Sequence, residues 1–151
     1  MEQVALNKNC NETRACLDSN AECNNTICQC KSGYFSSNGT CYEKFSLYQN
    51  CSGAGTCKDV NAECNVTCQC KNDYYNNSGM CSQKFSLYQN CSGAGTCKDL
   101  NAVCNVTCQC KNNYYNNSGT CWPKVALNES CNDPSACKEP HAECLKLVVN
   151  A

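Results

Sequence analysis

The spacing of the cysteines constrains this chain more than any other feature of its sequence. The first set, within residues 10–41, follows the pattern C-x5-C-x6-C-x4-C-x-C-x10-C. Two further sets repeat it with one residue fewer between the third and fourth cysteines, and a partial set of three follows. A period of about 40 residues indicates a tandem array of small repeats. We place repeats 1 to 4 at residues 4–43, 44–83, 84–123 and 124–151.

Composition shows why the cysteines have to act together. They supply 21 of the 151 residues, whereas the chain has one tryptophan, three phenylalanines and one histidine. Too few large apolar side chains remain for one hydrophobic core of this size, so crosslinks must hold the fold. Disulfides and metal clusters both supply crosslinks, and catalysis is a third use of cysteine.

Each alternative to disulfides lacks a partner that it needs. A structural zinc site uses two cysteine knuckles, or one knuckle with paired histidines, but each complete repeat has a single Cys-x-Cys pair. A catalytic thiol needs a histidine to form the thiolate, and the only one, His141, stands where the other repeats carry asparagine. We therefore expect disulfides, with no metal ion and no cofactor.

Charge and hydropathy argue against several classes of protein. The formal net charge is −1, with 12 basic and 13 acidic residues, so the counterion release that drives nucleic-acid binding is missing. No apolar run approaches the ~18–20 residues that span a bilayer. No histidine-based triad or phosphate loop is present to support acid–base or nucleophilic chemistry. We expect a protein that is not an enzyme, binds no nucleic acid and has no membrane span in this segment.

Repeats 2 and 3 are near copies that differ at six of forty positions. Any site in one of them would therefore recur in the other. The duplication fits either a spacer unit or a bivalent binding surface.

Three sequence features resemble the epidermal-growth-factor-like (EGF-like) module. They are the cysteine pattern, Asn-Ala-Glu-Cys-Asn at 20–24 and Cys-Gln-Cys-Lys-Ser-Gly-Tyr-Phe at 28–35. The short loop between the third and fourth cysteines, with Leu-x3-Cys at the start of a repeat, resembles the EB-type variant of invertebrate extracellular proteins. The resemblance implies a small disulfide-rich fold of tandem modules, each with short two-stranded antiparallel hairpins, and no common hydrophobic core.

The resemblance also implies a disulfide pairing: first with third, second with fourth and fifth with sixth. Spacing alone leaves fifteen pairings open for six cysteines. The implied pairs are Cys10–Cys23, Cys16–Cys28, Cys30–Cys41, Cys51–Cys64, Cys57–Cys68, Cys70–Cys81, Cys91–Cys104, Cys97–Cys108, Cys110–Cys121 and Cys131–Cys144. Cys137 is then left over, so we expect a free thiol or an intermolecular disulfide there.

Local patterns predict several turns and strands. Asn38-Gly39 is typical of a tight hairpin, and Ser78-Gly79 takes its place in repeat 2. Gly33 and its counterparts Asp73 and Asn113 predict a positive φ after the fifth cysteine. Phe45-Ser46-Leu47-Tyr48 and its copy at 85–88 alternate apolar and polar residues, which predicts a short strand.

We expect no calcium site. Calcium-binding EGF-like modules place acidic residues just before the first cysteine, because this cation needs carboxylate oxygens. Here those positions read Asn7-Lys8-Asn9, Tyr48-Gln49-Asn50 and Asn128-Glu129-Ser130, with at most one carboxylate.

Two features predict an extracellular location. Disulfides persist in oxidising compartments, and the chain contains ten Asn-x-Ser/Thr sequons. Those at Asn50 and Asn90 have cysteine in the middle, which hinders modification. The other eight are candidate N-glycosylation sites: Asn11, Asn24, Asn38, Asn65, Asn76, Asn105, Asn116 and Asn128. Asparagine also suits turns because it tolerates left-handed backbone conformations, so both uses stay open.

The opening residues contain no basic and no apolar leader region. We therefore expect residues 1–151 to be part of a longer secreted or membrane-anchored protein. The function we expect is that of a non-catalytic structural or interaction segment in an adhesive, matrix or receptor ectodomain, with an extracellular protein or glycan as ligand. The alternative is a secreted soluble ligand or protease inhibitor that uses a disulfide-framed loop.

Overall fold

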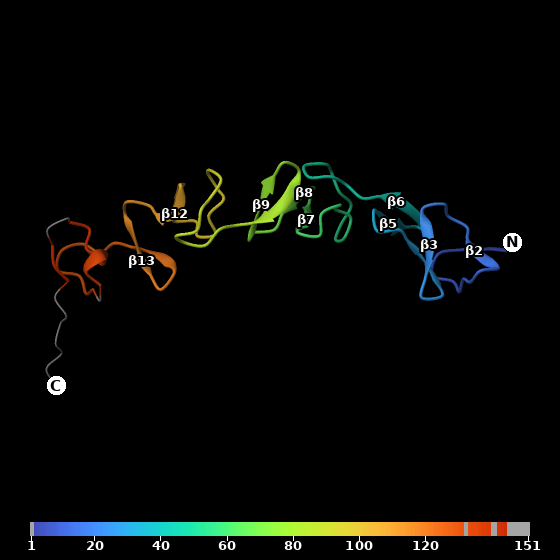
Figure 1. The fold of residues 1–151 in the computed structure, drawn as a ribbon, viewed down its shortest axis with the longest axis horizontal. Coiled ribbons are helices and arrows are strands. Elements are labelled where there is room, and N and C mark those ends of the chain that lie inside the picture. Colours follow the sequence, from blue (N-terminus) through green and yellow to red (C-terminus); the bar gives the residue numbers. More distant parts are fainter. Residues whose placement is uncertain (1, 132, 140–141, 145–151) are drawn as a thin grey trace, which may run out of the picture. The chain divides into compact units, whose positions relative to one another are not determined.

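The computed structural model describes residues 2–131, 133–139 and 142–144 (Figure 1). Strands in this part of the chain pair into seven two-stranded sheets, and the only helix described is a single 3-10 turn, η1 (Pro134–Ala136). His141 and the last seven residues of repeat 4 lie outside the described residues.

Each complete repeat contains two hairpins. The first hairpins are β3 (Ala21–Asn24) with β4 (Ile27–Cys30), β7 (Ala62–Asn65) with β8 (Thr67–Cys70), and β11 (Ala102–Asn105) with β12 (Thr107–Cys110). The second hairpins are β5 (Tyr34–Ser37) with β6 (Thr40–Glu43), β9 (Tyr74–Asn77) with β10 (Met80–Gln83), and β13 (Tyr114–Asn117) with β14 (Thr120–Pro123). This arrangement confirms the expected class, a small disulfide-rich fold of two-stranded antiparallel hairpins.

The first hairpin changes its turn where the sequence loses one residue. In repeat 1, Asn25 and Thr26 form the turn with φ of 48° and 66°, the signs of a type I′ turn. In repeat 2, Asn65 pairs directly with Thr67, and Val66 turns the chain alone with φ of 69°. A β-branched residue strongly resists this backbone conformation. The turn carbonyl has one task in both repeats, because it accepts a hydrogen bond from the amide of the first cysteine, at 2.8 Å and 3.0 Å.

The second hairpin has the tight turn that the sequence predicts. Asn38 and Gly39 have φ of 49° and 79°, and Ser37 pairs with Thr40 across the turn. Two positive φ values again fit a type I′ turn, which asparagine and glycine tolerate best. Ser78 and Gly79 repeat the geometry with φ of 52° and 91°.

The predicted strand at 45–48 is wrong, and so is its copy at 85–88. Only Phe45 pairs, in one parallel bridge with Cys57, and the chain then turns. The Gln49 side chain holds this turn because its Oε1 accepts a hydrogen bond from the Ser46 amide at 2.8 Å. In repeat 1 the same parallel contact extends to a short sheet of β1 (Glu2–Val4) and β2 (Arg14–Cys16).

The predicted positive φ after the fifth cysteine is also wrong, since Gly33, Asp73 and Asn113 have none. The Tyr34 amide donates to the Lys31 carbonyl at 2.9 Å, which closes a turn of the type I kind without left-handed residues. The carbonyls of these three residues instead accept hydrogen bonds from the backbone amide of the lysine that follows each second hairpin, at 2.8–2.9 Å.

Half-cystines form most of the buried interior. Cys28, Cys68 and Cys108 are the largest fully buried side chains of the described residues, and Val4 joins Cys10 and Cys28 in a small cluster. Large apolar residues stand in solvent instead, with Val60 80% and Leu100 83% exposed. The fold therefore has local cystine cores in place of a common hydrophobic core.

The described chain divides into two compact units, residues 2–72 with 76–82, and residues 73–75 with the described residues that follow 82. The boundary falls inside β9 because the start of that strand contacts the next repeat. Within the second unit, the rings of Tyr75 and Phe85 lie 6.0 Å apart. Within the first unit, the rings of Phe35 and Phe45 lie 5.7 Å apart. Within each unit, an aromatic residue thus packs against the phenylalanine that opens the next repeat.

Candidate functional site: the disulfide frame and its exposed surface

The structure joins the same cysteines that the EGF-like resemblance implies. Ten disulfides are present, with Cα atoms 5.4–5.8 Å apart, inside the usual range for this bond. They are Cys10–Cys23, Cys16–Cys28, Cys30–Cys41, Cys51–Cys64, Cys57–Cys68, Cys70–Cys81, Cys91–Cys104, Cys97–Cys108, Cys110–Cys121 and Cys131–Cys144.

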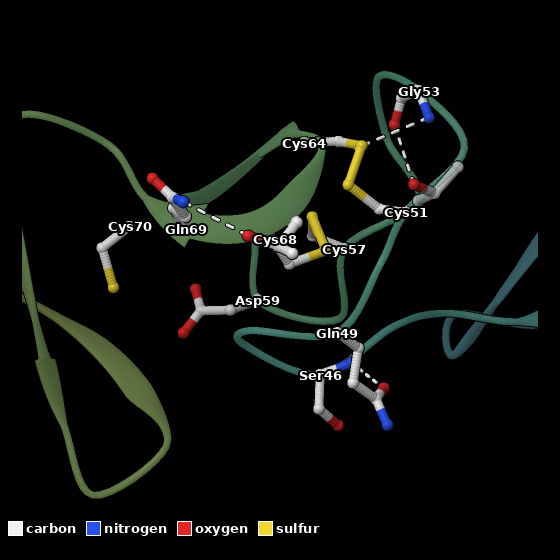
Figure 2. Close-up of a disulfide and its surroundings, with 12 residues drawn as sticks. Ser46, Gln49, Cys51, Gly53, Cys57, Asp59, Cys64, Cys68, Gln69 and Cys70 are labelled. Carbon is white, nitrogen blue, oxygen red and sulfur yellow. Dashed lines mark hydrogen bonds between the residues drawn. A yellow bond between two sulfur atoms is a disulfide. The ribbon is translucent and has the colours of Figure 1, made fainter.

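Two of the three disulfides in each complete repeat lie against each other. In repeat 2 the Sγ atoms of Cys51, Cys57 and Cys68 all lie within 4.8 Å of one another (Figure 2). The Gly53 amide donates a hydrogen bond to Cys64 Sγ at 3.3 Å, which fixes the loop between the first two cysteines. Cys51 is bonded to Cys64 and Cys57 to Cys68, so these sulfurs offer no thiolate to a metal ion.

The third disulfide is directed elsewhere by the alternation of a strand. Cys68 and Cys70 lie two residues apart in β8, so their side chains share one face while Gln69 between them is exposed. Cys68 bonds backward to Cys57, and Cys70 bonds forward to Cys81 in the second hairpin. One short strand therefore ties both halves of the repeat together.

An aspartate adds a polar tie that the sequence analysis missed. Asp59 Oδ2 accepts a hydrogen bond from the Cys81 amide at 2.6 Å, and Oδ1 accepts one from the Asn61 amide at 2.8 Å. Asp18 and Asp99 make the same pair of bonds in repeats 1 and 3. The signal was present, because an aspartate stands two residues after the second cysteine in all three complete repeats.

The aspartate of repeat 1 is held in its charged form. The amides of Cys41 and Asn20 donate to its carboxylate, and they lower the pKa of Asp18 below the usual value. The nearby Lys31 lowers the pKa further, whereas desolvation opposes both effects. The negative charge therefore serves the fold at neutral pH.

Cys137 is the one cysteine outside a disulfide, and all the cysteines lie in the described residues. It is half-buried and sits in a parallel bridge with Val125, as Cys57 does with Phe45 in repeat 2. In repeat 2, Cys57 bonds to the fourth cysteine, Cys68. Residues 124–151 hold three cysteines, so the equivalent of Cys68 is missing from them and Cys137 is left as a thiol.

An apolar groove recurs beside the aspartate. In repeat 2 it has a volume of about 400 Å³, and its walls include Leu47, Val60 and Met80. A smaller groove of about 220 Å³ occupies the equivalent place in repeat 1. Two of the six differences between repeats 2 and 3 change this lining, since Leu100 replaces Val60 and Thr120 replaces Met80. The near copies therefore differ in the shape of an exposed surface.

The sequon asparagines lie at the surface or close to it. Asn116 is half-buried, and the other seven candidates are exposed: Asn11, Asn24, Asn38, Asn65, Asn76, Asn105 and Asn128. Asn50 and Asn90, whose sequons contain cysteine, are exposed as well. Asn76 and Asn116 differ from the rest because each Nδ2 donates to a tyrosine hydroxyl, at 3.2 Å and 3.1 Å.

The positions before the first cysteine show what their polar side chains do. Glu129 Oε2 accepts a hydrogen bond from the Ala126 amide at 2.8 Å, just as Gln49 Oε1 accepts one from Ser46. The Glu129 carboxylate thus closes a turn, and a glutamine side-chain amide performs the same task in repeats 2 and 3.

Among the described residues no helix is long and apolar enough to cross a membrane.

Comparison with known proteins identifies one family. The family model of the EB module matches residues 1–41 and again residues 30–81, which together span just over half of the 151 residues. No curated protein and no solved structure gives a significant match. The matched segments contain the cysteines of repeats 1 and 2, in the disulfide-rich hairpin fold described above. The chain therefore belongs to the EB module family.

Proposed function

We propose that this chain is a non-catalytic, extracellular structural or interaction segment, built from modules at 4–43, 44–83 and 84–123 and a partial module at 124–151. The observation that carries the proposal is the disulfide frame. Ten bonds hold hairpins that have almost no apolar core, so the fold depends on them. Such bonds persist only in an oxidising compartment, which supports a location outside the cell.

The chemistry of the side chains supports a non-catalytic role. Twenty of the 21 cysteines are engaged in bonds, so they are unavailable as nucleophiles. The aspartates after the second cysteines accept hydrogen bonds from the backbone and hold the fold together. Membership of the EB module family, a family of non-enzymatic disulfide-rich domains, points the same way.

Repetition supplies the mechanism that we propose. Two near-identical modules present the same loops twice, and a second contact by a linked module benefits from a raised effective concentration. Weak contacts to an extracellular protein or glycan then suffice for retention at a surface. The exposed apolar residues and the grooves beside Asp18 and Asp59 provide contact area of this kind.

Fractionation of the native protein tests this role. An antibody against the folded chain is applied to membrane, matrix, medium and cytosolic fractions, with thiols blocked before lysis. Retention of the oxidised protein in the membrane or matrix fraction supports the proposal. Free protein in the medium alone favours the soluble ligand or inhibitor. Reduced protein in the cytosol contradicts both.

A further inference from the structure

Tyr48 occupies a backbone position that does not suit a tyrosine. Its φ is 67°, and the equivalent Tyr88 has the same value. Repeats 1 and 4 carry Asn7 and Asn128 there, at φ of 63° and 70°, and asparagine tolerates this conformation. The turn is the same in repeats 1 and 2, because the amide of residue 7 or 48 donates to the carbonyl of the fourth cysteine at 2.9 Å or 2.8 Å. The tyrosine side chain must therefore be favoured for another reason.

The tyrosine ring is exposed, and its hydroxyl contacts the asparagine of a sequon. Tyr48 is 65% exposed and Tyr88 66%, so burial does not account for either ring. Tyr48 Oη accepts a hydrogen bond from Asn76 Nδ2 at 3.2 Å, and Tyr88 Oη accepts one from Asn116 Nδ2 at 3.1 Å. Nδ2 is the atom that carries the sugar in an N-glycosylated asparagine.

The tyrosine and the sequon asparagine occur together within this chain. Repeats 2 and 3 carry both, at positions 28 residues apart in sequence. Repeat 1 carries neither, because it has Asn7 in place of the tyrosine and Ser36 in place of the asparagine. A hydrogen bond between exposed groups contributes little to stability on its own. It therefore does not explain why a large aromatic side chain stands at this position.

We propose that Asn76 and Asn116 are N-glycosylated and that the first sugar ring covers the exposed face of Tyr48 or Tyr88. The inference rests on the extracellular location proposed above. In the modification step Nδ2 bonds to C1 of a sugar carried by a lipid diphosphate. The C1–O bond to the diphosphate breaks, the lipid diphosphate leaves with the electron pair, and the amide nitrogen loses one proton.

The geometry places the sugar beside the ring. One N–H of the amide remains after modification and is available for the bond to the tyrosine hydroxyl. The sugar grows from an atom that already lies at hydrogen-bond distance from the end of the ring. A tyrosine offers an apolar body with a polar tip, so the apolar face of a sugar ring finds a surface to cover. Burial of that face removes the apolar area that the structure leaves in water.

The test uses the full chain secreted from a eukaryotic cell line behind a cleavable leader. Glycopeptide mass spectrometry measures occupancy at each sequon, and NMR detects contacts between the first sugar and the tyrosine ring. The matched control is Ser78→Ala, which removes the sequon and keeps both Asn76 and Tyr48. A second variant, Tyr48→Asn, restores the residue of repeats 1 and 4 and keeps the sequon.

We expect occupancy at Asn76 and Asn116, with sugar protons shifted upfield by the ring and cross-peaks to Tyr48. Tyr48→Asn should keep the glycan at Asn76 and lose the shift. Unmodified Asn76 and Asn116 in a secreted chain with its ten disulfides formed would overturn the inference and leave the proposed function standing. Glycans that show no contact with the tyrosines would also overturn it. A chain that emerges with reduced cysteines would refute the extracellular location instead.

Discussion

Removal of the Asp59 carboxylate should loosen the second hairpin of repeat 2. Asp59→Ala deletes the acceptor of the Cys81 amide, a bond of 2.6 Å that joins residues 22 positions apart. A hydrogen bond to a charged group contributes about 1.5–3 kcal/mol to stability. Asp59 is only half-buried, so we take the lower half of that range, about 1.5–2 kcal/mol. Each 1.4 kcal/mol changes an equilibrium roughly tenfold, which predicts that the Cys81 amide exchanges about 10- to 30-fold faster.

Amide hydrogen exchange followed by NMR measures this effect directly. Asp59→Asn keeps one oxygen acceptor without the charge, so it should fall between the native chain and the alanine variant. The control is Asp73→Ala, because the Asp73 side chain makes an exposed ion pair with Lys98 at 3.7 Å and its backbone carbonyl is kept in the variant. Exposed pairs of this kind contribute about 0–1 kcal/mol. Equal exchange of the Cys81 amide in the native chain and in Asp59→Ala would refute the role given to the carboxylate.

Three further predictions follow from single residues. Val66→Gly should raise the free energy of unfolding by about 0.5–1 kcal/mol, because removing the strain of a β-branched residue at positive φ outweighs the backbone entropy that glycine loses on folding. A denaturant midpoint no higher than that of the native chain would contradict this. Val60→Gly is the control without positive φ and should lower the midpoint. The lowered pKa of Asp18 means that its stabilisation is complete above the unfolded value of about 3.9 and is lost as pH falls through the folded pKa. An NMR titration of the Cys41 amide should have its midpoint below that value, and a midpoint at or above it speaks against the two amide bonds. Thiol counting on the denatured, unreduced protein should give one thiol per chain, and Cys137→Ser should give none; three or more thiols in the native chain, or a thiol that maps to another cysteine, would be incompatible with the pairing.

The features that could be predicted from sequence are those encoded by neighbouring residues. The cysteine spacing predicts a disulfide-rich repeat, and Asn38-Gly39 predicts a tight hairpin because the backbone preferences of those two residues decide the turn. The same local approach failed at Phe45–Tyr48. Alternation of apolar and polar residues favours a strand, but the Gln49 side chain outside the pattern closes a turn.

Contacts between distant residues could not be predicted in this way. Asp59 meets Cys81 only after the disulfides have brought the two halves of the repeat together. Tyr48 meets Asn76 for the same reason, and neither residue alone signals the other. Comparison of repeats 1 and 2 offered a clue, since both positions change together between them.

The disulfide map of the unreduced protein tests the central claim most directly. Proteolysis between neighbouring cysteines, followed by mass spectrometry, identifies each linked pair of peptides. We predict first-to-third, second-to-fourth and fifth-to-sixth bonds in each complete repeat, Cys131 with Cys144, and a thiol at Cys137. Bonds between different repeats, or clusters of free thiols that bind metal, would contradict the account of this chain as an array of independently stapled extracellular modules.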